Sequence, residues 1–131
     1  MTADEEALAR LSGLRIAEFE ALYHDFDVIW QVMQIERLNY AGRQTAPGAG
    51  RKYAVGRREQ LLSVLLWSHL GLHPRDISRL LGVHVSTFAR IRQRVLAVLD
   101  RLDVEIEIPD RNAYKEIDQL AEAYPELRHL G

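Results

Sequence analysis

The sequence predicts a mainly α-helical protein, a helix-turn-helix domain with a long N-terminal helix and one short C-terminal strand followed by a helix. Three observations lead to this fold class. Apolar residues recur three and four positions apart over most of the 131 residues, which is helical spacing. Gly71 and Gly82 stand where two of these runs stop, as helix-ending glycines do. Strict apolar–acidic alternation, the pattern of a strand, is confined to residues 103–108.

Composition limits the kind of protein this can be. The chain suits one domain with an appended arm, and it has no cysteine, which excludes disulfides and thiolate metal sites. Its acidic start lacks the pattern of a signal peptide. The longest near-apolar run, residues 61–67, is far shorter than the ~20 residues that span a bilayer. We therefore expect no membrane partner and a cytoplasmic, nucleoid-associated location.

Charge is divided unevenly along the chain. Residues 1–36 hold 2 basic and 8 acidic side chains, a net charge of −6. Residues 37–101 hold 12 basic and 3 acidic side chains, or +9, and residues 102–131 hold 3 and 8, or −5. The positive charge lies where the helix-turn-helix is predicted, as expected of a surface that faces DNA.

The N-terminal segment, residues 1–38, is predicted to be helical. Thr2 and Glu5 have capping-box spacing, so a short helix is expected over Ala3–Arg10, followed by a break at residues 11–13. A long helix over Arg15–Leu38 carries one apolar and aromatic stripe: Ile16, Phe19, Tyr23, Phe26, Trp30 and Met33. The stripe fits packing on the domain core or pairing with a second subunit. Its breadth favours the core.

Residues 39–57 are predicted to form a basic, flexible loop. Residues 39–50 are rich in Gly, Ala and Pro and are the segment most expected to be disordered without DNA. A cluster of cationic and aromatic residues follows: Arg51, Lys52, Tyr53, Arg57 and Arg58. The cluster suits contacts to DNA phosphates, and a plain solvated charge run is the alternative.

Residues 58–101 are predicted to be the DNA-binding domain. A helix over Arg58–Leu70 is apolar nearly all round and should form its buried centre. The helix-turn-helix follows, with a first helix over Arg75–Leu81, a turn at Gly82, and a second helix starting at His84 or Val85. The apolar face of the second helix consists of Phe88, Ile91, Val95, Val98 and Leu99.

The second helix of such a unit lies in the DNA major groove. Small Ser86 and Ala89 allow close approach, Arg90 suits a guanine edge, and Gln93 suits adenine. Arg92 and Arg94 are better placed for phosphates. The full predicted DNA-binding set is Val85, Ser86, Thr87, Ala89, Arg90, Gln93, Arg94, Arg51, Lys52, Tyr53, Arg57, Arg58, Arg75 and His84. A helical hairpin with a merely solvated basic face is the competing interpretation.

Residues 102–131 are predicted to be an acidic strand-helix tail that links to a further domain. Val104, Ile106 and Ile108 alternate with acidic residues, which predicts a half-buried or edge strand. Pro109 should stop it. Asp110 should then cap a last helix that runs through Tyr124 and ends at Pro125.

The sequence resembles the N-terminal part of bacterial insertion-sequence transposases of the DDE type, the insertion-sequence 5-like group. The similar stretches are LSGLRIAEFEAL, the basic GRKYAV, QLLSVLLWSHLGLHPRDISRLLGVHVSTFARIRQRVLAVL and the proline-led tail from IEIPDRNAYKEI onward. The resemblance implies binding to the terminal inverted repeats of a mobile element. It carries over to Val85, Ser86, Arg90, Gln93, Arg51 and Lys52, whereas His84 replaces the family's usual Ser or Thr, which predicts a weaker helix cap or a phosphate donor.

In that family a separate domain supplies three acidic residues and magnesium to cut and join DNA. This sequence stops about where the first of those acids is expected, so no catalytic residue carries over and no enzyme activity is predicted. A separate reading frame, a shortened form and a regulator derived from a transposase all fit.

Two other functions fit the same residues. A stand-alone transcription regulator would use the same surface, and WSHLGLHPRDISRLLGVHVSTF also resembles the promoter-reading end of sigma factors. A protein-interaction or oligomerisation module would use the long helix and the strand. A homodimer is compatible with either function. No cofactor or small-molecule substrate is predicted. His69 and His73 are spaced like metal ligands, but Gly71 interrupts the helix between them, so no metal site is predicted.

Overall fold

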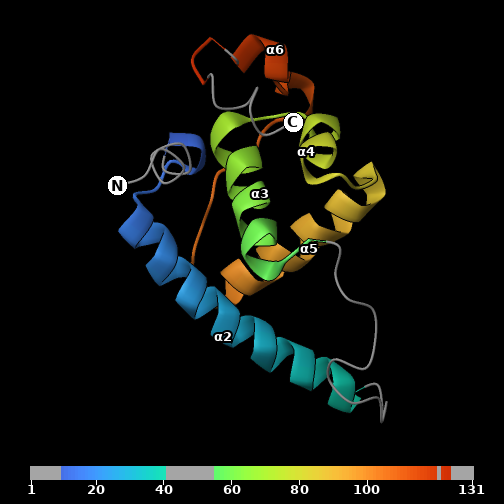
Figure 1. The fold of residues 1–131 in the computed structure, drawn as a ribbon. Helices are drawn as coiled ribbons and strands as arrows, with labels where there is room; N and C mark the ends of the chain where they lie inside the picture. Colours follow the sequence, from blue (N-terminus) through green and yellow to red (C-terminus); the bar gives the residue numbers. More distant parts are fainter. Residues whose placement is uncertain (1–9, 41–54, 121, 125–131) are drawn as a thin grey trace.

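A computed structural model describes residues 10–40, 55–120 and 122–124, and these are mainly helical (Figure 1). After a helical turn at residues 10–12 come α2 (Ile16–Tyr40), α3 (Arg57–Leu70), α4 (Pro74–Leu81) and α5 (Val85–Arg101), then a 3-10 turn (Arg111–Ala113) and α6 (Ile117–Leu120). The four long helices lie within two residues of their predicted limits. No helix in these described ranges is both long and apolar enough to cross a bilayer.

Several predictions concern residues outside the described ranges. They are the helix over Ala3–Arg10, apart from its last residue, the loop from residue 41 onward, and the end of the tail from Pro125. The predicted loop began at residue 39, but α2 continues through Tyr40.

Helix α3 is the centre of the domain, with α2 and α5 crossing it and α4 beside it (Figure 1). The prediction of a buried central helix is confirmed, because its side chains from Ser63 to Ser68 are all buried. Two buried polar side chains of α3 have partners: Gln60 donates to the Val55 carbonyl at 2.9 Å, and Ser63 donates to the Gln60 carbonyl at 2.8 Å. These bonds offset the desolvation of both side chains.

The aromatic stripe of α2 packs inward onto the same chain. Phe19 and Phe26 are fully buried and Trp30 is 3% exposed, in one core cluster with Leu61 and Phe88. The rings follow each other along the helix, with Phe26 and Trp30 centroids 5.6 Å apart. Intramolecular packing of this stripe is therefore confirmed.

A tight turn joins α4 to α5 at Gly82. Its φ of 71° is left-handed, and its N–H donates to the Arg79 carbonyl at 3.2 Å. Val83 N–H donates to the Ser78 carbonyl at 3.0 Å, which satisfies another carbonyl at the end of the helix. Glycine adopts this conformation without the steric cost that a Cβ brings. The predicted helix stop at Gly82 is confirmed.

Gly82→Ala should lower the free energy of unfolding by about 1–2 kcal/mol, the cost of a left-handed alanine. An added Cβ meets nothing within 4 Å, so the effect is purely conformational. Gly82→Asn is the matched control and should lose less, because asparagine tolerates this region better. Urea denaturation measures both. An alanine variant as stable as the wild type would contradict the assigned turn.

The predicted C-terminal strand is absent from the described residues. Residues 104–110 are extended but form no ladder with another strand, and the described chain contains one isolated bridge, between Leu72 and Lys115. Val104 and Ile106 pack against the helical core, while Glu105 and Glu107 point outward. Ser68 donates to the Glu107 carbonyl at 2.6 Å. Val104 and Ile106 therefore lie on helices rather than on another strand of the described part of the chain, and Ile108 is 61% exposed.

The predicted last helix is also wrong in extent. Asp110 does act as an N-cap, accepting from Asn112 N–H at 3.0 Å, but only for the 3-10 turn. The chain then runs extended, because Lys115 pairs with the linker between α3 and α4: Lys115 N–H donates to the Gly71 carbonyl at 2.9 Å, and His73 N–H donates to the Lys115 carbonyl at 2.8 Å. Helix α6 follows as one short turn anchored by buried Leu120.

Candidate nucleic-acid interface

Helix α5 divides cleanly into a buried and an exposed face. The five predicted core positions, from Phe88 to Leu99, are all buried. The opposite face carries exposed Val85, Ser86, Ala89, Arg90 and Gln93, and Thr87 is half-buried beside it. The side chains of Arg90 and Gln93 thus reach solvent next to two small residues. This exposed face is called the α5 stripe below.

His84 caps the start of α5 with its side chain. Its Nδ1 accepts the backbone N–H of Ser86 at 3.1 Å and lies 2.8 Å from Ser86 Oγ. Because Nδ1 is the acceptor, the neutral ring carries its hydrogen on Nε2. His84 therefore replaces the usual hydroxyl cap and keeps an N–H to donate at the exposed end of the α5 stripe.

Two arginines on the borders of the α5 stripe lie over tryptophan rings. On one border, the Arg92 guanidinium carbon is 5.0 Å from the Trp67 ring centroid in α3. On the other, the Arg94 guanidinium carbon is 5.2 Å from the Trp30 centroid in α2. Both arginines are half-buried, and stacking on an aromatic face restricts a guanidinium while its edges can still donate.

Arg57 and Arg58 do not join the α5 stripe. Arg57 pairs with Asp27 and lies over Trp30, and Arg58 makes a two-pronged contact with Glu20 and lies over Phe19. The hydrogen bond with Arg58 lowers the pKa of the Glu20 carboxyl and raises the pKa of Arg58. Both arginines, which the sequence predicts as phosphate ligands, fasten the start of α3 to α2.

A third such pair joins α5 to α2, as Arg101 donates to Glu36 at 2.9 and 3.3 Å, which lowers the pKa of Glu36.

The ion pairs of Glu20 and Glu36 should make stability depend on pH. A carboxyl whose pKa is lowered in the folded state adds stability at pH values above its ordinary pKa of 4.5, and this stability is lost as the pH falls through the lower folded-state pKa. The melting temperature of the wild type should therefore fall more between about pH 6 and about pH 3.5 than that of Glu20→Gln/Glu36→Gln. Equal falls in melting temperature would show that neither ion pair contributes to the stability of the fold.

The α4 side of the turn carries further basic residues. Arg75 is exposed at the start of α4, with its guanidinium 4.0 Å from Glu116. Its backbone N–H donates to Nδ1 of His73 at 3.1 Å, so a histidine caps α4 as another caps α5. Arg79, 80% exposed at its side chain, was missed in the sequence, although it lies across the helix from buried Ile77.

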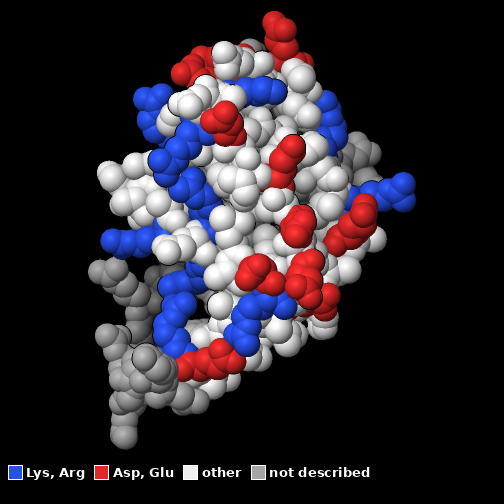
Figure 2. Space-filling model, turned by 180° about the vertical axis from the view of Figure 1, so that it is seen from behind, with Lys and Arg blue, Asp and Glu red and all other residues white. Residues whose placement is uncertain are grey.

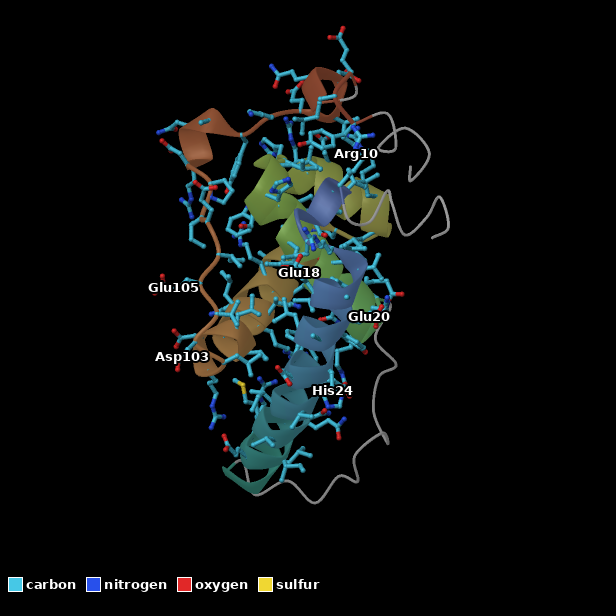
Figure 3. All side chains as sticks on the ribbon, turned by 90° about the vertical axis from the view of Figure 1, so that its left-hand side faces the viewer. Arg10, Glu18, Glu20, His24, Asp103 and Glu105 are labelled. Atoms are coloured by element: carbon cyan, nitrogen blue, oxygen red, sulfur yellow. The ribbon has the colours of Figure 1, made fainter. Side chains whose placement is uncertain are left out.

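Charge separates over the surface as it does along the chain. Figure 2 shows Lys and Arg gathered along one side of the molecule, the side where α4 meets the start of α5, and Asp and Glu gathered along the other. In Figure 3, Asp103 and Glu105, after α5, point out from one edge of the view, and Glu20 on α2 points out from the other edge. His24 on α2 is also exposed.

The remaining predicted site residues, Arg51, Lys52 and Tyr53, lie outside the described ranges. Within those ranges, no group of three or more His, Asp or Glu side chains could hold a metal ion. Comparison of the chain with known protein families, with curated proteins and with solved structures finds no match.

Proposed function

We propose that this chain binds double-stranded DNA with sequence preference, using α4 and α5 as a helix-turn-helix. The observation that carries the proposal is the α5 stripe: small Ser86 and Ala89 beside exposed Arg90 and Gln93. In such units the second helix enters the major groove, which distinguishes all four base pairs by their hydrogen-bonding edges. Arg90 donates to guanine and Gln93 pairs with adenine in this arrangement.

The borders of the α5 stripe suit the phosphate strands on either side of a major groove. Arg92 and Arg94 occupy opposite borders, and His84 offers an N–H at the start of the helix. Contacts of this kind set the register of the protein on the duplex without specifying sequence. The concentration of basic residues on this side supports the same docking (Figure 2).

The resemblance to insertion-sequence transposases supports transposon ends as the target. In this role the chain recognises the terminal inverted repeats, and DNA cleavage belongs to a catalytic domain. A transcription regulator would use the same stripe on a promoter or operator, so the bound DNA distinguishes the two.

The test is selection of bound duplexes from a library that combines random and genomic fragments. The proposal expects enriched fragments to share a short motif and to map to transposon ends, with affinity that falls steeply as salt rises. Enrichment of promoters would replace the transposase role with the regulator role. Absence of both enrichment and salt-dependent binding would overturn DNA binding itself.

A further inference from the structure

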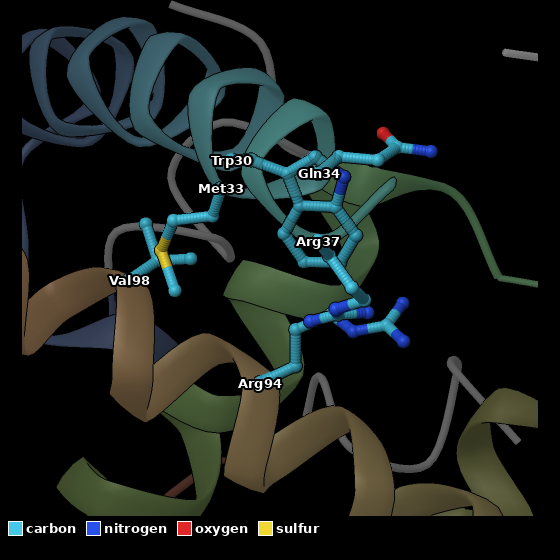
Figure 4. Close-up of a pocket in the computed structure, with 6 residues that line it drawn as sticks. All are labelled: Trp30, Met33, Gln34, Arg37, Arg94 and Val98. Carbon is cyan, nitrogen blue, oxygen red and sulfur yellow. The ribbon is translucent and has the colours of Figure 1, made fainter. Parts of the chain in front are cut away.

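The seam between α5 and the last third of α2 holds a small pocket. Trp30, Met33 and Val98 form its apolar floor, and Gln34, Arg37 and Arg94 form its polar rim (Figure 4). The pocket has a volume of about 20 Å³, close to that of one water molecule. An organic ligand does not fit inside it. What the seam offers is its rim, with two guanidinium groups and an amide.

The rim carries positive charge from both helices. Three further arginines pair with carboxylates of α2: Arg57 with Asp27, Arg58 with Glu20, and Arg101 with Glu36. Arg37 is exposed and has no ion pair with any residue in the described ranges. Arg37 and Arg94 present their guanidinium groups to the same rim, so an anion held there would be attracted to both.

The rim lies at the border of the α5 stripe that faces α2. Arg94 stands on the border of the α5 stripe that faces α2, and its guanidinium lies over the Trp30 ring. Arg37 projects from α2 to the same rim, as Figure 4 shows. A phosphate strand that borders the groove occupied by α5 would pass over this point. Guanidinium groups match phosphate oxygens well, because each presents several donors in one plane.

We propose that Arg37 and Arg94 together bind a single backbone phosphate of the DNA at the α2–α5 seam. This inference rests on the proposed DNA binding and extends it from the helix-turn-helix to the end of α2. The long N-terminal helix then has two roles: its aromatic stripe supports the core, and its last turns touch DNA directly.

The test is a salt titration of duplex binding by wild type, Arg37→Gln, Arg94→Gln and the double variant. The salt slope is the slope of the logarithm of the binding constant against the logarithm of the salt concentration. Loss of two arginines that share one phosphate should reduce the magnitude of this slope by about 0.9, whereas loss of contacts to two separate phosphates would reduce it by about 1.8. Affinity of the double variant at 0.1 M salt should fall roughly eightfold, by the same factor for specific and non-specific duplexes. Each single variant should show part of this loss, and the losses should be coupled in a double-mutant cycle.

Two controls separate contact from general charge and from packing. Arg111→Gln removes one exposed positive charge from the acidic tail and should leave the slope unchanged. Arg94→Lys keeps the charge and should retain most of the wild-type slope. If the wild type binds DNA and Arg37→Gln has the same salt slope as Arg111→Gln, the seam contact is overturned and the proposed DNA binding is not. A double-variant slope change near 1.8 would overturn the shared phosphate. Absence of any wild-type binding would overturn the proposed function as well.

Discussion

Phe88→Ala should lower the free energy of unfolding by about 3–5 kcal/mol, the largest single-residue effect expected in this protein. Phe88 is fully buried, and the guanidinium of Arg92 lies 5.8 Å from its ring centroid. Removing the ring leaves a cavity beneath the α5 stripe and removes one support of that arginine. Domains of this size are stable by only about 5–15 kcal/mol, so α5 should also lose order at moderate temperature. Urea denaturation followed by circular dichroism measures the change.

Val85→Ala is the matched control for Phe88→Ala. Val85 is in the same helix but is 40% exposed, and substitutions at such positions change stability by about 0.5 kcal/mol or less. A Phe88→Ala variant no less stable than Val85→Ala would mean that α5 does not bury the face assigned to it.

Arg90→Ala should cost about 1–3 kcal/mol of binding free energy at one base pair and relax the preference there. The Arg90 side chain is exposed, so the stability of the fold should be unchanged. Binding to duplexes that vary one position at a time measures the effect. Arg90→Lys should also lose discrimination, because lysine cannot make a two-pronged contact with guanine.

Loss of a base contact changes the preference at one base pair, whereas loss of a phosphate contact weakens binding to all duplexes alike. If Arg90→Ala weakened every duplex equally, Arg90 would be a backbone contact. If it changed neither affinity nor preference, the register assigned to α5 would be wrong.

The helical part of the fold was predictable because local signals agreed. Apolar spacing placed α2, α3 and α5 within two residues, and Gly82 marked the end of α4. The exposure of Arg90 and Gln93 also followed from spacing, since Phe88, Ile91 and Val95 define the opposite face.

The C-terminal region was predicted less well, for a physical reason. Alternation in residues 103–108 predicts that one face is covered, but not whether a strand or a helical surface covers it or how far the cover extends; Ile108 is 61% exposed. Here Val104 and Ile106 lie on helices. The last helix was overextended because the pairing of Lys115 with Gly71 and His73 joins distant parts of the chain.

The same limit applies to the candidate site. Arg57 and Arg58 looked like free cations in the sequence, but their carboxylate partners lie 30 and 38 residues earlier. Arg37 gave the opposite difficulty: it is an unremarkable residue near a helix end, and only the packing of α2 on α5 brings it to the rim with Arg94. Ion pairs between elements cannot be assigned from spacing along one helix.

The most direct test of the central claim, that α5 lies in the major groove, is methylation protection on a selected duplex. Dimethyl sulfate modifies guanine N7 in the major groove and adenine N3 in the minor groove. The wild type should protect one guanine N7 and leave nearby adenine N3 positions reactive, and Arg90→Ala should lose that protection at saturating protein. Saturated binding without any protected guanine N7, or protection that is the same in Arg90→Ala, would contradict the claim.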